Sequence, residues 1–443
     1  MKICEACGLE FSRKLTKASH SCPVVTKPQF SDCFSCAVTQ INPSGVKDSY
    51  PHWWSAFNWL PSLNSMGLPL GINIEEMVDH HTHIVGTGDS GSGCYLNSEI
   101  FSVKHPISYI KMRAFMSGTG LQDFRDADES MVARLVQLIG ASNLDNEKAR
   151  HGRNFILAFD EVYEEDGRKA VEKSTFHVPN DYILRLARTH PDHFLPCVSV
   201  HPYRKDAISE LRRCARAGAR LVKWLPNSMF IDPTHEKCGP FFEAMKELDM
   251  VLLCHVGEEH SVDAMGLDNE LGNPLRLRAP LDKGVRVIAA HCATEGYCND
   301  IDSDGRERVE CFDMFLRLMD EKKYEGLLFG DISAVLAFRR IGYLPTLLDR
   351  ADLHPRLVNG SDYPVPALNI VVHTSKLVKA GLITAGERAA IDEVYKSNPL
   401  LCDFVLKRAL RSKKGGRFSD CIFTNNGALG VAALRSEAGV DVK

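Results

Sequence analysis

The alternation of short apolar runs with amphipathic helical patterns from Met77 onward constrains this chain most. Such alternation is typical of repeated βα units around a parallel sheet. The runs predict eight strands, at Met77–Ile84, Phe155–Glu161, Phe194–His201, Ala219–Leu225, Met250–His255, Val285–His291, Leu327–Ile332 and Arg356–Asp362. Between the strands we expect helices such as Glu129–Ile139, Asp181–Thr189, Ile208–Ala217, Phe241–Leu248, Phe312–Lys323 and Tyr343–Asp349. The pattern predicts an α/β fold, a (β/α)8 TIM barrel.

Length alone would suggest about three domains for 443 residues. The strand pattern instead predicts one barrel over residues 49–410, preceded by a short Cys-rich extension over 1–48. Residues 411–443 contain a Lys-Lys-Gly-Gly stretch, and we expect a loosely ordered tail there.

Charge and hydropathy exclude several classes of protein. The chain has 53 basic and 57 acidic residues and a formal charge of -4, which argues against a nucleic-acid partner. It has no apolar run of the roughly 18 residues that span a bilayer, and its first residues lack a signal peptide's apolar stretch. We expect a cytoplasmic protein with a small-molecule substrate and no membrane partner, and homo-oligomers remain open.

Polar residues stand where the predicted strands end, the edge on which barrel enzymes build their active sites. Residues i and i+2 of a strand share a face, so Asp79, His81 and His83 should project together. The ends of the later strands carry Lys223, His255, His291, Asp331 and Asp362. Barrel closure places the last strand beside the first. Imidazoles with one carboxylate suit zinc, and manganese or iron would fit a similar cage.

These residues resemble motifs of the amidohydrolase superfamily. Residues 79–83, Asp-His-His-Thr-His, look like the family's Asp-x-His-x-His on strand one. His255 and His291 resemble its histidines on strands five and six, and Gly-Ser-Asp-Tyr-Pro at 360–364 resembles the end of strand eight. Within the superfamily the chain resembles the amidohydrolase-2 branch, which includes decarboxylases of aminocarboxymuconate semialdehyde and related aromatic acids.

The resemblance implies a metal-dependent hydrolase in which a metal-activated water attacks a C–N or C–O bond of an amide, lactone or ester. The metal ligands would be His81, His83, His255 and Asp362. Asp362 would also act as general acid/base, and His291 would polarise the scissile carbonyl. Asp79 and Asp331 would support the site. If the site is binuclear, His255 and His291 would instead bind the second metal, and Lys223 would bridge the pair.

Two other functions remain open at this stage. One is non-hydrolytic, metal-dependent decarboxylation of an aromatic or unsaturated carboxylic acid, which needs a cation near the metal. Arg113, Arg339 and Arg340 could supply it. The other is a catalytically lapsed barrel that serves as a binding scaffold, which the full set of strand-end residues argues against.

The first 36 residues contain five of the fifteen cysteines. Cys4, Cys7 and His20 have the spacing of the first three ligands of a Cys2His2 zinc finger, with Cys22 as an irregular fourth. A competing set pairs Cys4 and Cys7 with Cys33 and Cys36, as in a zinc ribbon. Either set predicts a structural zinc that orders a core-poor segment.

Overall fold

A computed structural model describes residues 2–3, 10–11, 72, 76–102, 106–119, 126–140, 152–262, 265–368, 370–424 and 427–429. The chain divides into two compact units, Met1–Pro61 and Ser62–Lys443, whereas we expected a boundary after residue 48. In the first unit, strands β1 (Lys2–Ile3) and β2 (Glu10–Phe11) pair antiparallel. The candidate zinc ligands Cys4, Cys7, His20, Cys22, Cys33 and Cys36 lie outside the described residues, so the structural zinc stays a prediction.

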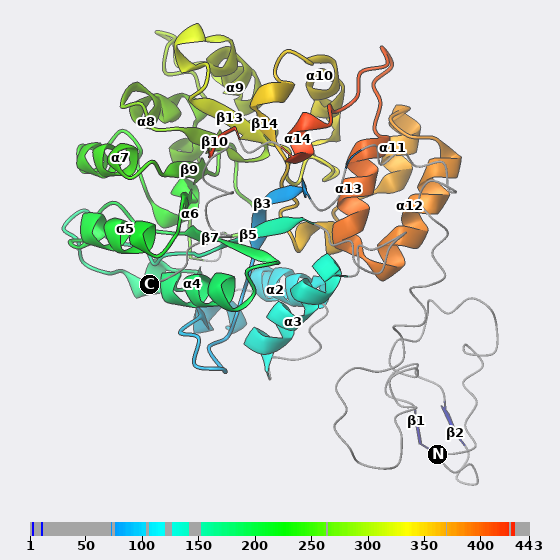
Figure 1. Cartoon of the computed structure of the whole chain (residues 1–443), viewed down its shortest axis with the longest axis horizontal. Helices are drawn as coiled ribbons and strands as arrows, with labels where there is room; N and C mark the ends of the chain where they lie inside the picture. The colour runs from blue at the N-terminus through cyan, green and yellow to red at the C-terminus, as the bar shows by residue number, and fades with distance from the viewer. Residues whose placement is uncertain are drawn as a thin grey trace, which may run out of the picture. The chain divides into compact units, whose positions relative to one another are not determined.

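The second unit contains the predicted barrel (Figure 1). Its strands are β3 (Val78–His83), β5 (Arg153–Leu157), β7 (Phe194–Val198), β8 (Leu221–Trp224), β9 (Val251–Cys254), β10 (Val287–Ala289), β13 (Leu328–Asp331) and β14 (Leu357–Val358). They form one parallel sheet in chain order, from β3 to β14. Each strand coincides with a predicted apolar run, which confirms the (β/α)8 fold.

Backbone hydrogen bonds between the first and last strands close the sheet. The His80 N–H donates to the Asn359 carbonyl (2.9 Å), and the Asp362 N–H donates to the His81 carbonyl (2.7 Å). The His83 N–H donates to the Tyr363 carbonyl (2.9 Å). Closure therefore brings the His-x-His of β3 next to Asp362, as the strand order predicted.

Helices surround the strands (Figure 1). Those that follow the strands are α3 (Ala127–Gly140), α4 (Asn180–Thr189), α5 (Ala207–Arg216), α7 (Cys238–Glu247), α8 (Arg278–Asp282), α9 (Cys311–Asp320), α10 (Leu344–Asp349) and α13 (Pro399–Ala409). Further helices are α2 (Pro106–Gly118), α6 (Pro226–Met229), α11 (Thr374–Ala380), α12 (Ala385–Ser397) and α14 (Cys421–Thr424). None of the helices in the described ranges has the length and apolarity that a membrane span requires.

The barrel interior is a packed apolar cluster to which all eight strands contribute side chains. Ala428 and Leu429, far along the chain, belong to the same cluster and are buried. Ile422 and Phe423 are also fully buried, and the Asn359 N–H donates to the Ile422 carbonyl (2.9 Å). The expectation of a loose tail from residue 411 is therefore wrong over its described part, because these apolar side chains are buried against the barrel.

Candidate active site

A cavity of about 400 Å³ opens where the strands end. His81, His83, Lys223, His255, His291 and Asp362 all line it. Its walls are largely apolar and include Met112 and Phe115 of α2 together with Phe176 and Phe338. The cavity therefore combines polar groups from five strand ends with walls that shield them from water.

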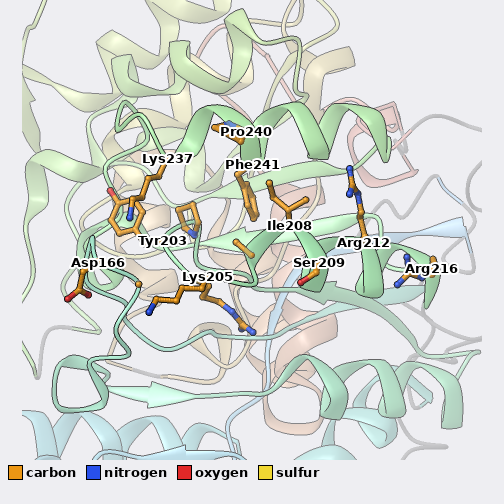
Figure 2. A pocket seen from close by; sticks show the side chains of 14 residues that line it. Asp166, Tyr203, Lys205, Ile208, Ser209, Arg212, Arg216, Lys237, Pro240 and Phe241 are labelled. Atoms are coloured by element: carbon orange, nitrogen blue, oxygen red, sulfur yellow. The ribbon is translucent and has the colours of Figure 1, made fainter.

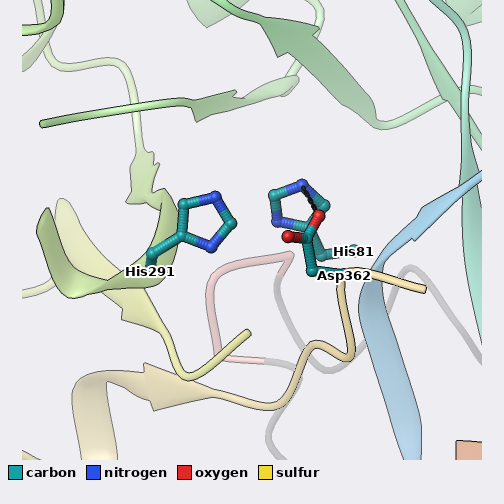
Figure 3. A group of neighbouring side chains, drawn as sticks. All are labelled: His81, His291 and Asp362. Atoms are coloured by element: carbon teal, nitrogen blue, oxygen red, sulfur yellow. Dashed lines mark ion pairs between the residues drawn. The ribbon is translucent and has the colours of Figure 1, made fainter. Parts of the chain in front are cut away.

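His81, His291 and Asp362 come closest together. Each offers a ligand atom, and these three atoms lie within 4.8 Å of one another. Figure 3 shows the two rings and the carboxylate facing a common space. The His81 and His291 rings stack with centroids 5.0 Å apart, and Nε2 of His81 lies 3.4 Å from Asp362 Oδ1.

His83 and His255 complete the group of imidazoles. The His83 Nε2 lies 3.2 Å from Asp362 Oδ1. The His255 ring lies 5.2 Å from that of His291, edge to face. Its Nε2 is buried without a hydrogen-bond partner among the described residues and lies 3.5 Å from a carboxylate oxygen of Glu259. The predicted residues thus meet, and their roles as ligands stay a prediction.

Burial holds His81, His255 and His291 in the neutral form that metal binding requires. Desolvation and the Lys223 ammonium place the pKa of His81 well below its usual value. Desolvation and Arg340 do the same for the pKa of His291. Desolvation, despite nearby Glu259, lowers the pKa of His255 to about 4.

The Asp362 carboxylate is ionised. Burial by itself raises the pKa of Asp362, but the neighbouring His81, His83 and Lys223 outweigh burial and hold that pKa below its usual range. Asp362 also has a positive φ of 60°, in the left-handed region that few residues with a side chain adopt. Its carboxylate is therefore presented by a tight, constrained turn.

Asp331, which we predicted as a supporting residue, orients His81. Its Oδ2 lies 2.9 Å from His81 Nδ1, and its Oδ1 accepts from the backbone N–H groups of His291 (2.8 Å) and Ser333 (2.9 Å). With Nδ1 donating to Asp331, His81 presents the Nε2 lone pair to the cavity. The Ser333 hydroxyl donates to Asp331 as well.

Ser333 is a residue that the sequence analysis missed. Its Oγ lies 2.7 Å from His291 Nδ1 and 3.1 Å from His81 Nδ1, so it touches both rings. The signal was present, because Ser333 follows Asp331 by two residues at the end of a strand.

Asp79 supports the site from behind. Its carboxylate accepts from the backbone N–H groups of His81 and Ser361, both at 2.9 Å, and from the Asn154 side-chain amide at 3.2 Å. Asp79 thus ties the first strand to the turn before Asp362. A register shift in β3 after Asp79 interrupts the simple alternation that placed it beside the two histidines.

Lys223 lies inside the site and is almost wholly buried. Its Nζ is 3.0 Å from His81 Nε2. Desolvation, which opposes the attraction of Asp362 and Asp331, lowers the pKa of its ammonium. A neutral amine at this place is compatible with the bridging role that the family resemblance implies, and that role stays a prediction.

The donor set fits a divalent metal ion. Imidazole nitrogens of His81 and His291 and the ionised carboxylate of Asp362 converge in a buried space, and Nε2 of the neighbouring His255 has no hydrogen-bond partner among the described residues. A buried polar atom without a partner is costly, and a cation is the ligand that would satisfy it. The described residues thus form a candidate metal site.

Two arginines and two glutamates line the cavity: Arg339, Arg340, Glu259 and Glu295. The sequence analysis named the two arginines and neither glutamate. Glu295 accepts from Nε of Arg340 at 2.9 Å through one oxygen, and its other oxygen forms an ion pair with Nε of Arg339 at 2.9 Å. Nη1 of Arg340 is buried and has no acceptor among the described residues. Arg113, the third predicted arginine, is not among the cavity-lining residues. Glu259, four residues after His255, was missed.

A second group of possible ligand atoms, in Asp160, Glu161 and His177, lies near the end of β5. Its carboxylates already have cationic partners. Arg204 donates to both oxygens of Asp160, at 3.2 and 3.0 Å, and Lys169 pairs with Glu161. This group is therefore a set of salt bridges.

A larger cavity of about 620 Å³ lies apart from the imidazoles, between α5 and α7 (Figure 2). Arg212 and Arg216 border one part of it, and Lys205 and Lys237 border another. None of the residues that line it is a histidine or a cysteine. The chemistry predicted from the strand ends belongs to the smaller cavity.

The chain is similar to several solved structures at low sequence identity. No curated protein matches the chain. An uncharacterised TIM-barrel protein from Bordetella bronchiseptica matches with a TM-score of 0.45 and 15% identity, over 74% of this chain and 99% of that one. A 5-carboxyvanillate decarboxylase from Novosphingobium aromaticivorans matches with a TM-score of 0.36 and 12% identity, over 65% and 87%. An IDCase from Metarhizium anisopliae matches with a TM-score of 0.39 and 12% identity, over 75% and 97%.

The family model described as amidohydrolase matches residues 78–400, most of the chain. The matched range begins at the strand that carries His81 and His83 and extends beyond Asp362. The chain belongs to the amidohydrolase family, and it is an enzyme.

Proposed function

We propose that this enzyme uses a divalent metal, with zinc as the first candidate, to hydrolyse a C–N or C–O bond of a small molecule. The observation that carries the proposal is the convergence of His81, His291 and Asp362 within 4.8 Å, at a cavity of about 400 Å³. A cavity of this volume suits a small molecule.

His81, His83, His255 and Asp362 would hold the ion. When bound, such a cation lowers the pKa of a coordinated water to about 7 and so supplies a nucleophile near neutral pH. The Asp362 carboxylate accepts a proton from the attacking water and passes it to the leaving group. Asp331 keeps the proton of His81 on Nδ1 throughout.

The hydrogen bond that Ser333 makes with Nδ1 of His291 determines which of two roles His291 can take. If its hydroxyl, 2.7 Å away, turns from Asp331 and donates to Nδ1 instead, then Nε2 carries the proton and can stabilise negative charge on the substrate oxygen. If Nδ1 instead donates to the Ser333 carbonyl, 3.2 Å away, then Nε2 has a free lone pair and can bind a second metal. The first arrangement belongs to a mononuclear enzyme and the second to a binuclear one.

The test combines metal content with activity. We expect purified, metal-reconstituted enzyme to retain one or two equivalents of divalent metal in the barrel, and the His81→Ala/His83→Ala variant to lose them. A screen of amides, lactones and esters should then find a substrate whose turnover requires the metal. A wild-type barrel that binds no divalent metal would refute the proposal.

Decarboxylation is the second candidate, and Arg340 favours it. A buried guanidinium held by Glu295 at the wall of the cavity, whose Nη1 has no acceptor among the described residues, is suited to bind a substrate carboxylate. The two reactions differ in product. Hydrolysis in H2¹⁸O introduces ¹⁸O into the product, whereas decarboxylation releases CO2 and adds a solvent proton to carbon.

A further inference from the structure

Two cysteines touch each other in the hairpin that follows strand β10. Cys298 lies in β11 (Tyr297–Asn299), and Cys311 is the first residue of α9, directly after β12 (Arg308–Glu310). Their sulfur atoms are 3.1 Å apart and both side chains are fully buried. No other pair of cysteines among the described residues has a sulfur–sulfur contact.

The backbone holds the two residues in this position. β11 and β12 pair antiparallel, with Cys298 opposite Val309, and the Cys311 N–H donates to the Gly296 carbonyl at 3.0 Å. A disulfide has a sulfur–sulfur distance of about 2.05 Å, so the sulfurs need to approach by only about 1 Å. We propose that Cys298 and Cys311 are a site of intramolecular disulfide formation.

The thiols are protected while the hairpin is closed. The contact with Cys298 and burial raise the pKa of the Cys311 thiol, so at neutral pH it is protonated and a poor nucleophile. The hairpin tip, in contrast, is exposed from Asp304 to Arg308. Local opening from this tip would expose Cys298, and reclosure would return the sulfurs to contact.

The oxidant would be a low-molecular-weight disulfide such as glutathione disulfide. In the open hairpin one cysteine thiolate attacks it, forms a mixed disulfide and releases one glutathione. The second cysteine thiolate then attacks the protein sulfur of the mixed disulfide and releases the other glutathione. The protein loses two thiol hydrogens and two electrons, and the oxidant becomes two molecules of glutathione.

The disulfide would restrain a wall of the active-site cavity. Glu295 and Gly296 directly precede β11, and Glu295 holds Arg339 and Arg340. The Tyr297 N–H also donates to Glu258 at 3.3 Å, in the segment that follows β9. Oxidation would therefore reduce the mobility of the loop that positions Arg340, whatever reaction the site catalyses.

The experiment uses the full chain, equilibrated with glutathione disulfide or with dithiothreitol. After alkylation and trypsin digestion at the exposed Arg306 and Arg308, mass spectrometry should find the two cysteine peptides linked in the oxidised sample alone. The amide hydrogens of β11 and β12 should exchange on the order of 100-fold more slowly after oxidation, the effect expected from closing a loop of about 15 residues.

Matched variants separate this pair from other thiols. Cys298→Ser should lose both the linked peptide and the added protection, whereas Cys214→Ser, a buried cysteine on α5, should keep both. Two results would overturn the proposal. One is that wild type yields no linked peptide although hydrogen exchange shows that the hairpin opens. The other is that Cys298 and Cys311 acquire only separate glutathione adducts.

Discussion

Replacing Asp331 with Asn tests whether the site is built to bind a metal. The substitution conserves shape and removes one negative charge from a fully buried position. Asp331 contacts His81 Nδ1 at 2.9 Å through one oxygen and accepts two backbone N–H groups through the other. An asparagine oxygen can continue to accept the backbone groups, and its NH2 group then faces His81 Nδ1.

Two donors cannot share that contact, so His81 would move its proton to Nε2. The lone pair that faces the cavity is then lost as a metal ligand. Removal of a partner that orients a ligating histidine typically weakens metal binding about 10- to 100-fold. This range corresponds to about 1.4–2.8 kcal/mol of binding free energy.

The assay is a competition titration of the reconstituted enzyme against a chromophoric chelator, which gives the metal dissociation constant. Asp160→Asn is the matched control, because Asp160 is a buried carboxylate at the end of another strand and pairs with Arg204. We expect the control to bind metal like wild type. An Asp331→Asn variant that folds and binds metal within twofold of wild type would refute the reasoning.

Three further predictions concern stability, metal binding and substrate affinity. Burial raises the pKa of Asp403 from 3.8 to about 7. Its proton therefore stabilises the folded state fully below about pH 4, and this contribution is lost as the pH rises through 7. The free energy of unfolding measured in urea should fall by a few kcal/mol over this pH range, and Asp403→Asn should abolish the fall. Gly360→Ala should lose metal affinity in the same chelator titration, because the new Cβ would lie 2.9 Å from the His81 Cβ. Arg340→Gln should raise KM for a carboxylate-bearing substrate at least tenfold while a neutral analogue is unaffected, and equal effects on both would count against an anion-binding role.

The strand pattern and the site motifs could be predicted from the sequence because both depend on local order along the chain. Few folds accommodate apolar runs that recur between amphipathic helices. A barrel brings the ends of its strands together irrespective of the conformation of its loops. His81, His83, His255, His291 and Asp362 were found for this reason.

Other features depend on contacts between distant segments, and no local pattern marks them. Ile422 and Leu429 stand in a polar-looking chain end, and only the apolar surfaces of the folded barrel give them a place to be buried. Lys407 is fully buried because it donates to the Gly360 carbonyl (2.6 Å) and pairs with Asp403, behind the turn that presents Asp362. The hydrogen bond to Gly360 requires the last barrel helix to pack on the end of the last strand.

The sequence by itself determined the fold, the family and the residues that could hold a metal, since strand order and residue type suffice for all three. The tertiary structure alone decided how those residues are supported. It placed Ser333 between two imidazoles and, within the part of the chain that the structure describes, left one Arg340 nitrogen at the cavity wall without an acceptor. It also brought the sulfurs of Cys298 and Cys311 into contact. These arrangements depend on distances across the fold, which residue spacing along the chain does not specify.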